Sequence, residues 1–180
     1  MNKKLLLALA VTPAFFAPAT LAQDAKPKPA TADQPVLLGQ YGDWGAYKAS
    51  PGGKTVCFAL AKPVNAVLEP AGRKRDQSYL FISTRPSEKV KNEISAIVGY
   101  KQKAAVDTIA TIGAAQYAMY SQGDGAWIKN VTEEAQVIDA MRKNTEIIVR
   151  ATSINNAKST DTYTLKGLAQ ALDKVSEECK

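Results

Sequence analysis

The chain has 180 residues, a formal net charge of +6, two cysteines and no histidine. Without histidine it lacks the base of Ser-His-Asp and Cys-His catalytic sites, and also the commonest protein ligand of zinc and copper. The modest excess of basic residues is too dispersed to indicate a nucleic-acid-binding protein.

The N-terminal segment has the pattern of a secretory signal peptide. Lys3 and Lys4 precede an apolar stretch, residues 5–16, which is interrupted by Pro13 and is too short to span a membrane. Small or neutral residues before the expected site suit signal peptidase, so we predict cleavage after Ala22 and a mature net charge of about +4. We therefore expect a periplasmic or secreted protein with no transmembrane segment after cleavage.

Residues 23–35 are rich in proline and alanine and contain little that a core would bury, which is typical of a flexible linker. Residues 36–180 have the usual size of one folded domain. The predicted organisation is therefore a signal peptide (1–22), a linker (23–35) and a single domain (36–180).

The two cysteines are expected to pair, because disulfides persist in the compartments that an exported chain enters. Cys57 lies in a β-like apolar run, and Cys179 ends a helical stripe that contains Leu172 and Val175. In the chain-entropy model, closing so long a loop removes about 4–5 kcal/mol of unfolded-state entropy. A free reactive thiol is the alternative, but it has neither a C-x-x-C spacing nor a histidine to support it.

Apolar runs bounded by turn residues recur through the middle of the chain and are typical of β-strands. Partial alternation of apolar and polar residues predicts strands with one face on a core. A polar turn at 155–158 separates the last two runs, as in a hairpin. The predicted strands are residues 40–48, 55–61, 78–84, 93–101, 106–112, 116–121, 146–153 and 160–165.

Two segments have helical patterns. Thr132 is the expected N-cap of the first, which opens with acidic residues and ends with basic ones. The second runs from about residue 167 to 178. We therefore predict a mainly β fold, an antiparallel β-sandwich or open barrel with two short α-helices, one of them C-terminal. The expected apolar face of the first helix is Val131, Ala135, Ile138 and Met141.

No catalytic motif is recognisable, because the chain has no Ser-x-x-Lys, P-loop, Gly-x-Gly-x-x-Gly or Asp-rich calcium loop. We therefore expect a non-enzymatic protein without a cofactor or metal. The alternative is a cell-wall or glycan hydrolase that uses two carboxylates assembled in space. Asp43 and Asp124, each close to a tryptophan, are the candidates for that pair.

Tryptophans and one basic run supply the candidate binding surface. Trp44 and Trp127 each stand beside small residues, where a tryptophan either packs in a core or stacks on a ligand. Arg73, Lys74 and Arg75 form the densest basic run, which is either a solvated loop or a site for a polyanion. We predict a partner-binding surface around these five residues.

Five segments stand out in chain order: 41–47 (YGDWGAY), 57–63 (CFALAKP), 119–128 (MYSQGDGAWI), 139–143 (DAMRK) and 161–168 (DTYTLKGL). Together they resemble the invasion-associated locus B family of exported alphaproteobacterial proteins. Some members of that family have a further cysteine shortly after the Gly-Asp-Trp motif. Residues 46–48 of this chain, which follow that motif, are Ala-Tyr-Lys, so any second disulfide of those members is absent here. The resemblance covers essentially the whole mature domain.

The resemblance implies a periplasmic, surface-associated or secreted accessory protein and brings no established catalytic residues. Its name comes from the role of one pathogen member in entering host red cells, whereas many relatives belong to free-living or plant-associated bacteria. Residues and resemblance together lead us to expect an envelope-associated protein that binds a protein or polysaccharide partner, of the envelope or of a host surface.

Overall fold

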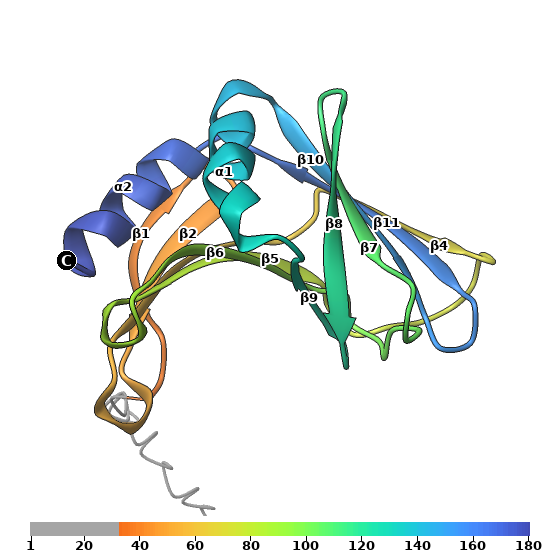
Figure 1. Cartoon of the computed structure of the whole chain (residues 1–180), viewed down its shortest axis with the longest axis horizontal. Coiled ribbons are helices and arrows are strands. Elements are labelled where there is room, and N and C mark those ends of the chain that lie inside the picture. Colours follow the sequence, from red (N-terminus) through yellow and green to blue (C-terminus); the bar gives the residue numbers. More distant parts are fainter. Residues whose placement is uncertain (1–32) are drawn as a thin grey trace, which may run out of the picture.

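An antiparallel β-sheet of eleven strands forms the framework of residues 33–180, the part of the chain that the computed structural model describes. The strand order is β1-β2-β3-β5-β6-β9-β8-β7-β10-β11-β4, and the sheet does not close into a barrel (Figure 1). The predicted signal peptide and most of the predicted linker lie outside the described residues. The strands are β1 (Val36–Tyr41), β2 (Trp44–Ala49), β3 (Val56–Ala61), β4 (Asn65–Glu69), β5 (Tyr79–Arg85), β6 (Val90–Ile97), β7 (Thr108–Ile112), β8 (Ala115–Gln122), β9 (Gly125–Ile128), β10 (Glu146–Thr152) and β11 (Lys158–Thr164).

Two α-helices pack on one face of this sheet, α1 (Glu134–Lys143) against β6 and α2 (Leu168–Glu178) against β1, β2 and β3. Three short 3-10 helices, η1 (Pro51–Gly53), η2 (Pro86–Glu88) and η3 (Val131–Glu133), occur in loops. Figure 1 shows α1 and α2 on the same side of the β5–β6 ribbon. The predicted fold class, mainly antiparallel β with two helices and one of them C-terminal, is confirmed.

The inner face of the sheet, on which α1 and α2 pack, is rich in alanine. In β3 and β5, buried residues alternate strictly with partly exposed ones, as expected for strands with one face on a core. Every residue of one row that crosses five strands is at most 1% exposed. Small side chains let the helices approach the sheet closely. The row consists of Trp44, Ala61, Leu80, Ala96 and Ala126.

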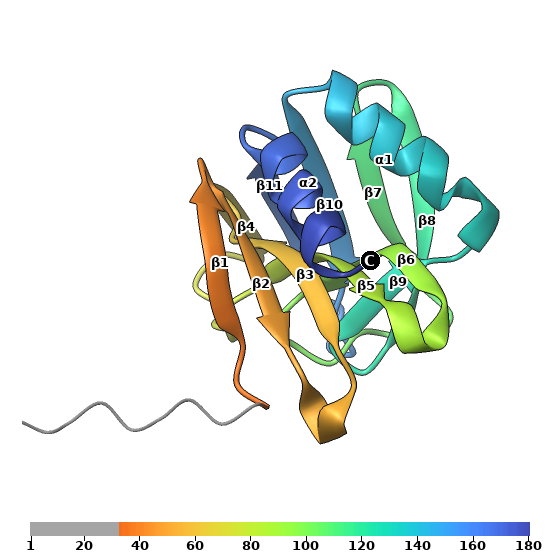
Figure 2. The same ribbon diagram turned by 90° about the vertical axis from the view of Figure 1, so that its left-hand side faces the viewer.

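Helix α2 is joined to the sheet by a disulfide. Leu168, Leu172 and Val175 are buried along one stripe of the helix, which therefore faces the core. Cys179, directly after α2, forms the predicted bridge with Cys57 in β3, and the two Cα atoms lie 5.9 Å apart. Figure 2 shows α2 beside the strands β1–β3. The C-terminal helix is thus fixed to an early strand.

The segment predicted as one strand, residues 40–48, is instead a hairpin between β1 and β2. Gly42 adopts a positive φ of 57° in the connecting turn. A side chain at Gly42 would come within 2.7 Å of the backbone oxygen of Lys166, so the turn lies against the segment that leads into α2. The prediction was wrong because Gly-Asp inside an apolar run supplies a tight turn here.

Other differences concern short elements. Strands β4 and β9 were not predicted, whereas the predicted hairpin of β10 and β11 is confirmed. In the first helix, Val131 is 72% exposed and Ala135 is also exposed, while Val137 is buried instead. The reason is that η3 precedes α1 and shifts the helical phase. The expected capping by Thr132 is also wrong, since the side chain of Asn130 accepts a hydrogen bond from the Thr132 backbone N–H at 3.2 Å.

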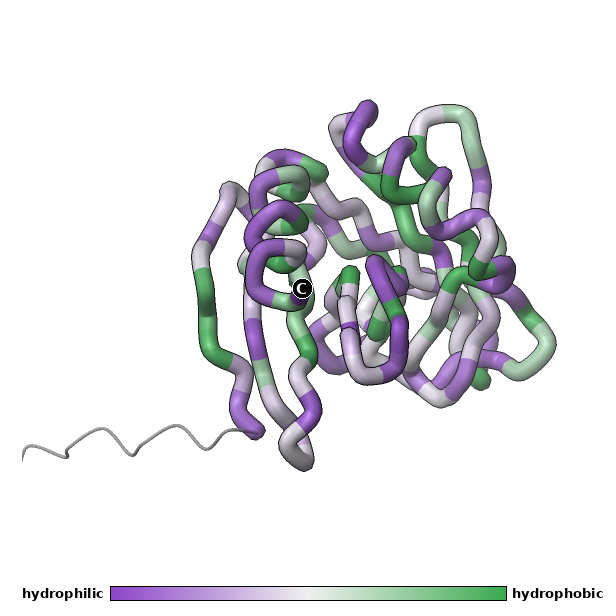
Figure 3. Tube along the Cα trace, turned by 60° about the vertical axis from the view of Figure 1, so that its left-hand side comes forward, coloured by the Kyte–Doolittle hydropathy of each residue, from purple (hydrophilic) through white to green (hydrophobic). Residues whose placement is uncertain are grey.

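The two edges of the sheet are β1 and β4. Val36 and Leu37 of β1 are each 52% exposed, and the green start of this strand is visible in Figure 3. Among residues 33–180, no helix is both long and apolar enough to cross a membrane.

Breaking the disulfide should destabilise the fold, because residues 122 positions apart are then no longer joined in the unfolded chain. We expect the double variant Cys57→Ser, Cys179→Ser to lose about 2–5 kcal/mol of unfolding free energy. Urea unfolding followed by circular dichroism measures this loss. Wild-type protein treated with a reductant should behave like the double variant, and an unfolding midpoint that reduction leaves unchanged would contradict the prediction.

Candidate binding surface

Trp44 lies in the core and not on the surface. Its side chain is completely buried, and its indole Nε1 donates a hydrogen bond to the backbone oxygen of Thr164 at 2.9 Å. Because Trp44 is paired with buried Ala61 of β3, it points to the inner face of the sheet. The prediction that Trp44 contributes to a binding surface is therefore corrected.

Arg75 turns inward from the basic loop and pairs with Asp161 of β11. Its Nη1 donates to Asp161 Oδ2 at 2.7 Å and to the backbone oxygen of Val98 at 2.9 Å, while Nη2 donates to Asp161 Oδ1. The side chains of Arg75 and Asp161 are only 8% and 1% exposed. A bidentate, buried guanidinium of this kind is not available to a polyanion, so Arg75 connects the loop before β5 to β11.

Two phenols lie around this ion pair. The hydroxyl of Tyr100 is 2.6 Å from the hydroxyl of Ser159. Burial raises the pKa of Tyr163, and the Asp161 carboxylate raises it further. Burial likewise raises the pKa of Tyr100. Both phenols therefore stay protonated at neutral pH, and the cluster is a structural polar network.

The structure does not gather the five predicted surface residues in one place, because two of them are buried. Arg73 and Lys74 remain exposed in the loop between β4 and β5, and within residues 33–180 neither makes an ion pair. Trp127, by contrast, lies on the outer face, which is the side of the sheet away from α1 and α2. Trp127 is therefore the predicted residue that belongs to an aromatic cluster on this outer face.

Trp127 stacks on Tyr120 of the neighbouring strand. The ring centroids are 5.6 Å apart, and the ring planes differ by 23°. Trp127 is partly exposed and Tyr120 is 44% exposed, so both rings are accessible to a partner.

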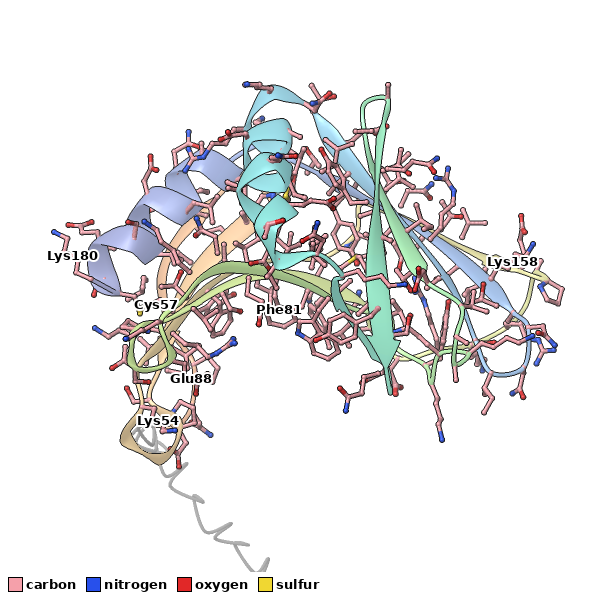
Figure 4. The ribbon with its side chains drawn as sticks, viewed as in Figure 1. Lys54, Cys57, Phe81, Glu88, Lys158 and Lys180 are labelled. Atoms are coloured by element: carbon pink, nitrogen blue, oxygen red, sulfur yellow. A yellow bond between two sulfur atoms is a disulfide. The ribbon has the colours of Figure 1, made fainter. Side chains whose placement is uncertain are left out.

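A second group of rings covers the outer face of β2, β3 and β5. The rings of Tyr47 and Phe58 are stacked, with their centroids 5.3 Å apart. The ring centroid of Phe81 is 5.7 Å from that of Phe58. Tyr79 lies 6.1 Å from Phe81 on the same strand. All four are partly exposed. Figure 4 shows Phe81 on the side of β5 that faces away from the helices.

The strand register joins the two groups into one band. Leu60 is paired with Phe81, and Phe81 is paired with Ser95 of β6. Ser95 is paired in turn with Trp127, and Trp127 with Tyr120. The band crosses β2, β3, β5, β6, β9 and β8, which is about 24 Å along the sheet at the usual strand spacing. We call it the aromatic belt. Its members are Tyr47, Phe58, Tyr79, Phe81, Tyr120 and Trp127.

Glycines lie under two of the belt rings. A Cβ atom on Gly45 would come within 2.6 Å of Cε2 of Tyr47, and one on Gly125 within 2.8 Å of Cζ3 of Trp127. Residues two apart share one face of a strand, so each ring leans back over the glycine that precedes it. The missing side chain thus provides the space in which each ring lies close to the sheet.

A pocket of about 360 Å³ adjoins the belt at Tyr47 and Leu60. Polar side chains of Gln40, Asp43 and Lys62 also line it. The ammonium group of Lys62 is 6.0 Å from the ring centroid of Tyr79, which places a cation at the border of the belt. The pocket therefore combines an aromatic ring, a carboxylate, an amide and an ammonium group.

The two carboxylates proposed for a hydrolase lie at different places along the sheet. Asp43 is in the β1–β2 turn, and Asp124 is in the β8–β9 turn. Four strand spacings separate β2 from β9, which is a distance of about 19 Å along the sheet. Glycosidases hold their two catalytic carboxyl groups about 5–10 Å apart. Nothing in this arrangement favours the hydrolase alternative.

Comparison with known proteins adds no assignment, since no family model, no curated protein and no solved structure matches the chain. Within residues 33–180, no three histidine, cysteine or acidic side chains are grouped so that they could hold a metal ion.

Of the belt residues, the predicted binding surface contained only Trp127. A usable pattern was present, because Gly45 and Tyr47 repeat the Gly-x-aromatic spacing of Gly125 and Trp127. This spacing does not reveal, however, on which face of the sheet the aromatic ring lies. Gly39 and Tyr41 have the same spacing, yet Tyr41 packs against the core.

Arg75 should contribute mainly to stability. Replacing it with methionine leaves the Asp161 carboxylate buried and unpaired, which we expect to cost about 3–5 kcal/mol of unfolding free energy. The exposed neighbour Lys74 provides the control, and Lys74→Met should change stability by no more than about 0.5 kcal/mol. Chemical denaturation of both variants checks this. Equal effects of the two substitutions would show that the buried pair is not important for stability.

Proposed function

We propose that this protein is an exported, non-enzymatic envelope protein that binds a protein or polysaccharide partner through its aromatic belt. The belt is the single observation that carries the proposal. A sheet with one face on the core usually has a polar second face, whereas here six aromatic side chains gather on it. Exposed aromatic surface of this kind is typical of interaction sites, in which tyrosine, tryptophan and phenylalanine are enriched.

Export is supported by two independent features. The N-terminal residues have the charge and length pattern of a signal peptide. The Cys57–Cys179 disulfide suits an oxidising compartment, where such bridges persist. Both features support a location in the periplasm or outside the cell.

The resemblance to the invasion-associated locus B family supports an accessory role at the envelope or at a host surface. Four belt residues fall within the segments that carry this resemblance: Tyr47, Phe58, Tyr120 and Trp127. The binding surface and the resemblance therefore rest on overlapping parts of the sequence.

Removing the exposed rings should weaken partner capture without unfolding the protein. Tagged protein with its disulfide intact is incubated with detergent-solubilised envelopes, and retained material is quantified. We expect the double variant Tyr120→Ala, Trp127→Ala to retain roughly tenfold less partner than wild type, because exposed tyrosine and tryptophan side chains dominate binding energies.

Val131→Ala is the control, because Val131 is 72% exposed but lies on η3, outside the belt. Its capture should equal that of wild type, and circular dichroism should show all three proteins folded. Equal capture by wild type and the double variant would contradict the proposal, as would a wild-type protein that retains nothing from either the envelope or host membranes.

A further inference from the structure

The pocket beside Tyr47 differs from the rest of the belt in its polar lining. Asp43 and Lys62 are both exposed, and within residues 33–180 neither forms an ion pair. The side chain of Gln40 donates through Nε2 to the backbone oxygen of Gly42 at 2.9 Å, which leaves its Oε1 as an acceptor. The pocket thus presents acceptors and a donor around one aromatic ring.

We propose that this pocket binds one sugar residue of a neutral polysaccharide whose chain continues along the aromatic belt. The proposal rests on the binding function proposed above and names the class of its ligand. The pocket volume of about 360 Å³ lies in the range of small-molecule sites, which extends from about 300 to 1,000 Å³.

The polar groups favour a neutral ligand that is rich in hydroxyls. A hydroxyl both donates and accepts, so it satisfies the Asp43 carboxylate and the Lys62 ammonium group at the same time. The two formal charges of the pocket lining cancel. A charged sugar would be attracted by one of these two groups and repelled by the other, so its charge gains little in the pocket while its desolvation costs free energy.

The ring of Tyr47 is held in place for stacking. It leans over Gly45, and Phe58 stacks against it with the planes differing by only 13°. Both residues lie in hydrogen-bonded strands in the interior of the sheet order, so little conformational freedom is lost when a ligand binds. The ring is partly exposed and lines the pocket, where it can contact the flat C–H face of a pyranose.

The shape of the belt favours a chain-like ligand over a folded protein. It crosses six strands, but no strand carries more than two of its rings and β6 carries none. Charged side chains border it, with Lys62 beside Tyr79 and the Arg85–Glu93 ion pair beyond Phe58, in which Nη1 and Oε2 are 2.9 Å apart. A stable protein interface needs a broader patch of about 800 Å² per partner.

The test measures binding of soluble tetrasaccharides of glucose, mannose and galactose by titration calorimetry. Oligogalacturonate and a glucosamine tetramer are the acidic and basic comparisons. The protein is purified with its disulfide oxidised. We expect saturable binding of at least one neutral tetrasaccharide, and at least tenfold weaker binding of both charged ones.

Variants then locate the site. Asp43→Asn and Lys62→Met should each weaken binding of the neutral tetrasaccharide by roughly tenfold. Gly45→Ala should have a similar effect, although it removes no functional group, because the added methyl group displaces the Tyr47 ring. Gly39→Ala is its matched control. It perturbs the same Gly-x-Tyr arrangement on the inner face, where a Cβ would lie 2.8 Å from the Tyr41 hydroxyl, and should leave the affinity unchanged.

The outcomes separate this inference from the proposed function. If no neutral tetrasaccharide binds while an envelope protein is captured through the belt, the sugar assignment is wrong and the binding function stands. Loss of sugar binding in the Tyr120, Trp127 double variant but not in the pocket variants would overturn the pocket while sparing the belt. Failure of both sugar binding and belt-dependent capture would overturn both proposals.

Discussion

The position of helix α2 against the inner face of the open sheet is the constraint on which the rest of this structure depends. Without barrel closure, β1, β2 and β3 have no opposing strands of their own, and α2 is what covers them. An isolated helix of 11 residues is marginal in water, so packing and the disulfide must hold α2 in place. The stripe of Leu168, Leu172 and Val175 supplies the packing, and Cys57–Cys179 supplies the covalent restraint.

Close helix packing explains why the two faces differ. On β2 and β3 the inner positions are mostly alanine, as at Ala46, Ala59 and Ala61, because a larger side chain would push α2 away. Large rings are therefore excluded from that face except at Trp44, whose indole bonds to Thr164 near the start of α2. The other two rings of these strands, Tyr47 and Phe58, lie on the outer face and form the start of the aromatic belt.

The sequence was sufficient for features that depend on local patterns or on counting. Strand periodicity, the polar turn between β10 and β11, and two cysteines in a chain with a predicted signal peptide led to the fold class, one hairpin and the disulfide. The orientation of a single side chain depends on register, which sequence periodicity does not supply. Trp44 and Trp127 stand in similar sequence surroundings, yet one is buried and the other is partly exposed. Arg75 was misassigned because its partner Asp161 lies 86 residues away.

Adjacent residues of β3 connect the stabilising bridge to the candidate binding surface. Cys57 points inward to Cys179, while Phe58 points outward and stacks on Tyr47. Successive side chains of a strand have opposite directions but share one backbone, so any displacement of Cys57 moves Phe58 as well. Helix α2 lies behind the same three strands that carry the pocket beside Tyr47 on their other side. The disulfide therefore stabilises both the core and the strands that present the rings.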